Sequence, residues 1–259
     1  MMEKITKTSV GYRLYGTGTK KIIALHSWMD DAESWNTTIP FLNINDFSYA
    51  FMDVRGYGES KNIKGVFTSD EIANDIFNLA ETLGWHKFYL IGHSMCGLAA
   101  QKAAILDKKG QIIKIALVTP VSAAGFAADP NTKEFFSSIV QNEEMAKVAY
   151  GAFTENRLSD YWATIRANRH VEVTDKVAQL EYINMWTGEN FIDQMKQVQI
   201  PFLVLPGQYD HPQFKLEAQK RAFAEFKHVD FTEIENAGHF PMQETPVFLI
   251  SSIERFFSE

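Results

Sequence analysis

The feature that most constrains the fold is a serine at the junction of a strand-like run and a helix-like run. Residues 88–91 are apolar and predict a buried strand, whereas residues 98–106 are rich in alanine and predict a helix. Between them the chain reads Gly-His-Ser-Met-Cys-Gly over residues 92–97. A sharp turn of this kind lifts the hydroxyl of Ser94 above the sheet edge, and the neighbouring strand and helix leave room only for small residues around it. Cys96 lies in this turn, and we expect its compact thiol to be tolerated there.

The size and charge of the chain narrow the class of protein. Of 259 residues, 46% are hydrophobic and 22% are charged, so the chain can fill a substantial core and is expected to be ordered. Its length predicts one large domain, or one core domain with an insertion. The formal net charge of −7 gives no electrostatic reason to bind nucleic acid or an anionic membrane surface.

The location of the protein is predicted from what the sequence lacks. A single cysteine excludes an intrachain disulfide bond and fits a reducing compartment. Residues 1–7 have no apolar run behind their charges, so they do not resemble a secretory signal. No segment approaches the roughly 20 apolar residues that a membrane span requires. We therefore expect a soluble, cytoplasmic protein.

Strand-like and helix-like runs alternate through the first half of the chain. This order predicts an α/β fold with a mostly parallel central sheet flanked by helices on both faces. A hairpin is expected over residues 5–15. Further strands are expected at residues 22–25, 49–52, 88–91 and 112–118, with helices at residues 35–42, 69–83 and 98–106.

The alternation stops after residue 120. Residues 121–198 are mostly helical in pattern and contain no convincing strand, so we expect a helical cap, or lid, inserted after the sixth strand. Residues 1–120 and 199–259 would then form the core. In that second core segment, strands are expected at residues 202–205 and 229–234, with helices at residues 215–226 and 247–257.

Three residues are candidates for nucleophilic catalysis. A serine is a weak nucleophile that needs a base, and the base needs an acid to orient it. Residues 236–240 contain His239 in the loop expected before the last helix, and residues 205–210 end a strand with Asp210 in the following loop. Ser94, Asp210 and His239 therefore occur in the chain order serine, acid, base, each at the carboxyl end of a strand, where ligands bind in open α/β sheets.

Other polar residues offer alternatives or structural roles. Asp129 and Asp193 could supply the acid, but both fall in the expected cap. His26 is expected to hold the loop after the first buried strand, His93 to pack at the turn, and His211 to be a loop residue rather than a second base.

An oxyanion hole needs two backbone N–H donors aimed at the developing negative charge. One candidate is Met95, which directly follows the serine. The other is Trp28, in the loop His-Ser-Trp that follows the strand at residues 22–25.

Aromatic residues are frequent in the expected cap, and we expect some of them to face a hydrophobic substrate. The candidate substrate-binding residues are Trp28, Phe126, Phe136, Trp162, Trp186 and Phe240. Arg166 and Arg169 could bind a substrate carboxylate, or could lie on the solvated face of a helix. Cys96 could be a second nucleophile, but its place in the turn favours a packing role.

No metal or cofactor is expected. The seven histidines show no spacing typical of metal ligands. The glycines at 56 and 58 lack the third glycine of a dinucleotide-binding loop.

Taken together, residues 26–28, 53–60, 92–97, 207–210 and 237–239 resemble the α/β-hydrolase superfamily over nearly the full chain. The particular resemblance is to capped single-domain bacterial esterases, perhydrolase-like proteins and C–C bond hydrolases. That family usually has glycine at the positions of Ser27 and Cys96. The resemblance implies a cofactor-free serine hydrolase, monomeric or homodimeric, that cleaves an ester or lactone of a small to medium hydrophobic substrate through an acyl-enzyme.

Two other functions remain open at the level of sequence. The same residues could cleave a C–C bond in a diketone-like substrate, with perhydrolysis as a nearby activity. The fold could instead serve a small-molecule receptor without catalysis, because fold alone does not fix function. Epoxide and haloalkane hydrolases are disfavoured, since they usually carry aspartate at the position of Ser94.

Overall fold

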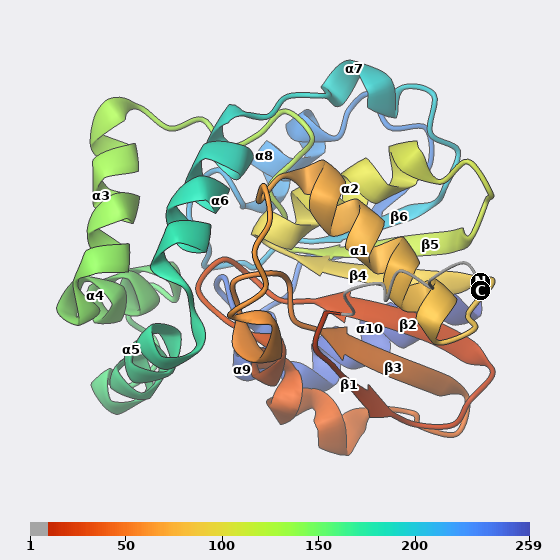
Figure 1. The fold of residues 1–259 in the computed structure, drawn as a ribbon, viewed down its shortest axis with the longest axis horizontal. Helices are drawn as coiled ribbons and strands as arrows, with labels where there is room; N and C mark the ends of the chain where they lie inside the picture. The colour runs from red at the N-terminus through yellow and green to blue at the C-terminus, as the bar shows by residue number, and fades with distance from the viewer. Residues whose placement is uncertain (1–9) are drawn as a thin grey trace, which may run out of the picture.

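A mostly parallel sheet runs through the centre of the computed structural model, which describes residues 10–259 (Figure 1). Within those residues the sheet has seven strands in the order β1-β3-β2-β4-β5-β6-β7, and only β1 is antiparallel to its neighbour. The strands are β1 Tyr12–Tyr15, β2 Lys20–Leu25, β3 Phe47–Met52, β4 Phe88–His93, β5 Ile112–Val118, β6 Phe202–Leu205 and β7 Val229–Phe231. The predicted α/β class is therefore confirmed.

The central strands are apolar because both of their faces are covered. Every residue of β3 and β4 is buried, as expected for parallel strands between two layers of helices. On one face α1 (Ser69–Thr82) packs beside α2 (Met95–Leu106), and α10 (Pro246–Ser258) lies on the other face (Figure 1). The Thr68 side chain accepts a hydrogen bond from the Glu71 amide and so caps α1.

Shorter elements complete the core. They are the 3₁₀ helices η1 Ala32–Phe41 and η2 Gly58–Ser60, and the helices α8 Leu216–Ala222 and α9 Pro241–Glu244. The helix expected at residues 35–42 is thus a 3₁₀ helix that begins three residues earlier and contains Pro40. The strand expected at residues 229–234 ends at Phe231, and Ile234 pairs separately with Gly207 in an isolated bridge.

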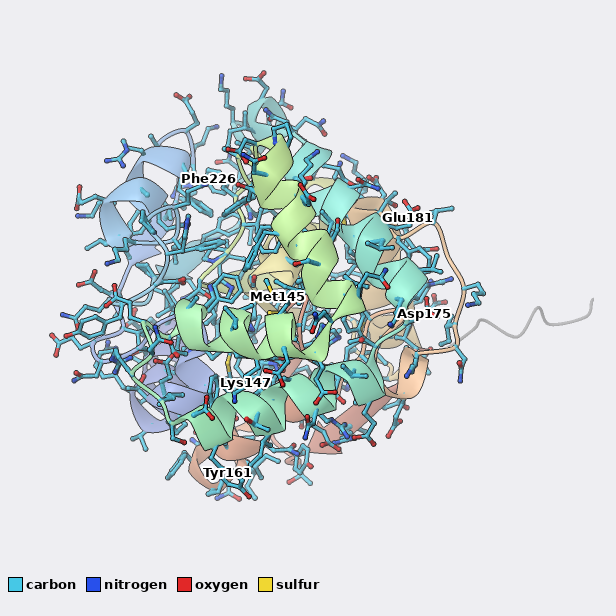
Figure 2. All side chains as sticks on the ribbon, turned by 90° about the vertical axis from the view of Figure 1, so that its left-hand side faces the viewer. Met145, Lys147, Tyr161, Asp175, Glu181 and Phe226 are labelled. Carbon is cyan, nitrogen blue, oxygen red and sulfur yellow. The ribbon has the colours of Figure 1, made fainter. Side chains whose placement is uncertain are left out.

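Residues between β5 and β6 form a set of helices that we call the helical insertion. Its helices are α3 Pro130–Gln141, α4 Glu143–Phe153, α5 Asp160–Val173, α6 Lys176–Gly188 and α7 Ile192–Met195. Helices α3 to α6 stand beyond the carboxyl ends of the parallel strands (Figure 1). In Figure 2 they face the viewer, with Lys147 on α4 and Tyr161 on α5. The insertion follows the fifth described strand. The first strand of the expected hairpin lies almost wholly in residues 1–9, outside the described residues.

Candidate active site

Ser94 lies on a strained turn between β4 and α2. Its backbone φ of 53° and ψ of −117° fall in a region that residues with a side chain rarely adopt. The turn is held from outside, because the Ser94 N–H donates to Val118 O (3.0 Å) and its carbonyl accepts from the Val121 N–H (3.0 Å). A Cβ on Gly92 would lie 2.6 Å from the Cys96 carbonyl oxygen. The crowding predicted around the serine is therefore present in the structure.

Ser94 has a base and an acid within hydrogen-bond distance. His239 Nε2 lies 2.8 Å from Ser94 Oγ, and His239 Nδ1 lies 2.8 Å from Asp210 Oδ2. All three residues are buried. With the Ser94 hydroxyl donating to Nε2 and the Nδ1–H donating to the carboxylate, the three groups form one continuous chain of hydrogen bonds.

The loops that carry Asp210 and His239 are in direct contact. A Cβ on Gly207 would lie 2.0 Å from the Gly238 carbonyl oxygen, so only glycine fits there. The Tyr209 N–H donates to Ala237 O (2.8 Å), which joins the loops a second time. This close approach allows a carboxylate from one loop to reach an imidazole on the other.

The other aspartates considered as acids lie elsewhere. Asp129 caps α3 by accepting a hydrogen bond from the Thr132 amide (2.7 Å). Asp193 pairs with Lys196 on the surface of α7 (2.9 Å). Both have local structural roles, and neither reaches His239.

The two residues that are candidates for the oxyanion hole lie at the same cavity as Ser94. Met95 and Trp28 both line it. Met95 is the first residue of α2, where the helix itself supplies no acceptor for the N–H. Within residues 10–259, neither backbone amide donates a hydrogen bond to another protein group.

The loop carrying Trp28 is fixed by His26. Its Nδ1–H donates to Ser27 O (2.7 Å), and its Nε2 accepts from the Val54 N–H (3.1 Å), which defines one neutral tautomer. His26 therefore holds the loop, as predicted. Ser27 is also buried in this loop and lines the cavity at the position where glycine is usual in the family.

The cavity beside Ser94 has a volume of about 30 Å³ and is largely apolar. It is lined by Ser27, Trp28, Met29, Ser94, Met95, Val121, Phe126, Phe136, Phe153, Trp186, Phe214, His239 and Phe240. Trp162 is not among these lining residues. Its indole N–H donates to Gln243 Oε1 (2.9 Å), and its ring packs against Phe240, 5.9 Å between centroids. Trp162 therefore supports a wall of the cavity rather than forming one.

Sequence reasoning missed two aromatic residues that contact the base. The rings of Phe214 and Phe153 lie 4.7 Å and 5.1 Å from the His239 ring, measured between centroids. Phe153 ends α4 and Phe214 follows the acid loop. The position of Phe214, four residues after Asp210, is the only sequence signal that could have suggested its role.

Arg166 and Arg169 pair with carboxylates and do not line the cavity. Arg166 pairs with buried Asp30, and Arg169 pairs with buried Asp31, so α5 is clamped to the loop after Trp28. Burial tends to raise the pKa of Asp30, but the charge and hydrogen bond of Arg166 outweigh it and lower the pKa overall. These arginines are therefore structural, and the residues lining the cavity include no lysine or arginine.

The two histidines next to the candidate catalytic residues are not bases in this arrangement. His93 Nε2–H donates to the His239 carbonyl oxygen (2.7 Å). Burial, followed by the nearby His239, lowers the pKa of His93 to about 3. His211 is an exposed residue beside Phe126, and partial desolvation lowers its pKa as well.

Within residues 10–259, no group of three His, Cys, Asp or Glu side chains could hold a metal ion. In the same part of the chain, no helix is both long enough and apolar enough to cross a bilayer.

Comparison with known proteins identifies the family. The family described as alpha/beta hydrolase fold matches residues 21–246. A protein named soluble epoxide hydrolase, from Corynebacterium sp. (strain C12), is 24% identical, and the alignment covers 96% of this chain and 94% of that protein. A solved bromoperoxidase from Bacillus anthracis is 19% identical with a TM-score of 0.84, covering 96% of this chain and 95% of the other. An esterase from Exiguobacterium antarcticum is 16% identical with a TM-score of 0.84, covering 96% of each chain.

The chain therefore belongs to the α/β-hydrolase fold family. The sheet and its flanking helices are the fold of that family, as the superposed structures show. Family membership and the hydrolases among the relatives support a hydrolase activity.

The structure predicts that the thiol of Cys96 is inert in the folded protein. Cys96 is fully buried, and burial raises its pKa, so the reactive thiolate is scarce. Native protein at pH 8 should show no labelling by iodoacetamide, measured by mass spectrometry, whereas denatured protein should be labelled fully. Rapid labelling of the native protein would contradict the assigned packing role.

The lowered pKa of His93 predicts that the stability of the protein depends on pH. Its folded pKa of about 3 lies below the value of about 6.5 in an unfolded chain, so the unfolded state binds the extra proton between these values. The free energy of unfolding should therefore fall as pH drops from 6.5 toward 3, by at most about 1.4 kcal/mol per pH unit from this group. Urea denaturation at several pH values should show that the free energy of unfolding changes less with pH in His93→Gln than in the wild type. Equal slopes in both proteins would contradict the assignment.

Proposed function

We propose that this protein is a cofactor-free serine hydrolase that cleaves an ester or lactone of a small to medium hydrophobic substrate through an acyl-enzyme. The observation that carries the proposal is the unbroken chain of hydrogen bonds from Asp210 through His239 to Ser94, ending at an apolar cavity. Each group in that chain has the role that its chemistry allows.

In the first half of the reaction, His239 Nε2 takes the proton of the Ser94 hydroxyl as Oγ attacks the substrate carbonyl carbon. Asp210 orients the imidazole through Nδ1–H and stabilises its charged form. The imidazolium then donates its proton to the leaving alkoxide, and the C–O bond breaks to leave an ester on Ser94. A lactone follows the same steps, but its alcohol stays attached to the acyl group.

In the second half, His239 takes a proton from water, and the resulting hydroxide equivalent attacks the acyl-enzyme. The proton returns to Ser94 Oγ, and the carboxylic acid leaves. In both halves, the amides of Trp28 and Met95 would stabilise the negative charge on the carbonyl oxygen. Losing one such donor costs about 3 kcal/mol of transition-state stabilisation in comparable enzymes.

The cavity favours an uncharged acyl group. Its lining is mostly aromatic and aliphatic, and the nearby cations Arg166 and Arg169 are already paired with Asp30 and Asp31. A substrate carboxylate would lose its hydration without gaining a partner there. The substrate class we propose is therefore a neutral ester or lactone.

We further propose that residues 121–198 act as a cap over a core made of residues 1–120 and 199–259. The insertion supports this division by supplying Phe126, Phe136, Phe153 and Trp186 to the cavity. The serine at position 94 favours an acyl-enzyme mechanism over epoxide hydrolysis, in spite of the name of the relative from Corynebacterium. The cytoplasmic location remains a prediction.

Replacement of the nucleophile gives the direct test. Ser94→Ala should lower kcat for a short-chain aryl ester at least about 10³-fold, because no other group can form the acyl-enzyme. Circular dichroism should show an unchanged fold, and a fluorophosphonate should label wild-type protein at Ser94 alone. Turnover by Ser94→Ala at the wild-type rate would reject the proposal. Ligand binding without turnover in the wild type would favour a receptor instead.

A further inference from the structure

A second buried carboxylate, Glu244, holds the loop that carries His239. The Gly238 N–H donates to Oε1 and Oε2 of Glu244, both at 2.9 Å, and the Phe240 N–H donates to Oε1 at 3.1 Å. These two amides flank His239 on either side. The Glu244 side chain is only 1% exposed, so its carboxylate is committed to this loop.

The opposite charge for Glu244 comes from the helical insertion. Arg157 lies between α4 and α5, and its Nη1 is 2.6 Å from Glu244 Oε2. Its Nη2 donates to the Asn236 carbonyl oxygen (2.5 Å), and its guanidinium lies 4.5 Å from the centre of the Tyr209 ring. Arg157 therefore contacts both the acid loop and the base loop. Arg157 is exposed, whereas the carboxylate that it pairs with is buried. Removing Arg157 would therefore leave the buried charge of Glu244 uncompensated.

Geometry at His239 leaves little tolerance for movement of this loop. The imidazole must keep Nε2 near Ser94 Oγ and Nδ1 near Asp210 Oδ2 at the same time. A displacement of about 1 Å in a catalytic group can cost on the order of 100-fold in rate. The carboxylate of Glu244 fixes the backbone on both sides of this ring, which is where such a displacement would begin.

We propose that Glu244, paired with Arg157 of the helical insertion, is a positioning residue that keeps His239 aligned between Ser94 and Asp210. The inference rests on the proposed function of the same site. A separate anchor, the hydrogen bond from the His239 N–H to Phe153 O (2.9 Å), remains when Glu244 is changed. Loss of the Glu244 carboxylate should therefore loosen the loop without unfolding the protein.

Four variants test this role. In Glu244→Gln, an amide NH₂ group replaces one of the two carboxylate oxygens. This group is a donor, so it cannot accept a hydrogen bond from Gly238 or Arg157. Arg157→Met removes the charge, whereas Arg157→Lys keeps it. Lys215→Met is the matched control, because Lys215 also pairs with an acidic residue of the insertion, Glu155 (3.4 Å), but both of these side chains are exposed.

The kinetic readout is kcat for an aryl ester. The enzyme concentration is taken as the concentration of serine that a fluorophosphonate labels, so that unfolded protein is not counted. Glu244→Gln and Arg157→Met should lower kcat at least 10-fold with KM changed by less than threefold. Arg157→Lys should recover most of the loss, and Lys215→Met should match the wild type. Wild-type kcat in Glu244→Gln would overturn the proposal, as would an equal loss in Lys215→Met.

A second readout does not depend on activity. Amide hydrogen exchange of the segment 236–244, followed by mass spectrometry, should be at least 10-fold faster in Glu244→Gln and unchanged in Lys215→Met. Unchanged exchange in Glu244→Gln would overturn the positioning role even if esters prove not to be substrates. A wild type that neither cleaves esters nor reacts at Ser94, but shows the faster exchange in the variant, would reject the proposed function and leave Glu244 as the anchor of the loop.

Discussion

Both ring nitrogens of the buried His239 imidazole lie within hydrogen-bond distance of another side chain, and the rest of the site is arranged around this constraint. His239 contacts Ser94 through Nε2 and Asp210 through Nδ1, and these residues follow β4 and β6 in the sheet. The ring can reach both only because the two loops touch at Gly207 and Gly238. Close packing of backbone against backbone therefore sets the distances on which the proposed proton transfer depends.

The helical insertion contacts the loops of the site on two sides. On the side of the proposed oxyanion hole, the Tyr150 hydroxyl on α4 donates to Met29 O (2.7 Å), and the Trp28 indole donates to Gln179 O on α6 (3.0 Å). On the side of the base, Arg157 reaches Glu244. Because the insertion holds both loops, any movement that admits substrate must preserve these contacts or carry the loops with it.

The local sequence pattern was sufficient to predict the central strands and helices and the order of the candidate catalytic residues. Buried parallel strands are apolar in sequence, and Ser94 and Asp210 follow two of them, β4 and β6. His239 follows β7, an edge strand that is not buried. Residues whose roles depend on distant partners could not be predicted. Nothing near Arg166 or Glu244 in the sequence indicates a pairing with Asp30 or Arg157, because those partners are brought close only by packing of the insertion. For the same reason, Trp162 could not be distinguished from the aromatic residues that line the cavity.

The most direct test of the central claim is the rate at which a fluorophosphonate labels Ser94 in Asp210→Asn compared with the wild type. If Asp210 orients His239 as the base for Ser94, labelling should slow by at least about 100-fold while the fold is retained. Equal labelling rates in the two folded proteins would show that the carboxylate and the imidazole do not activate this hydroxyl, and would contradict the account.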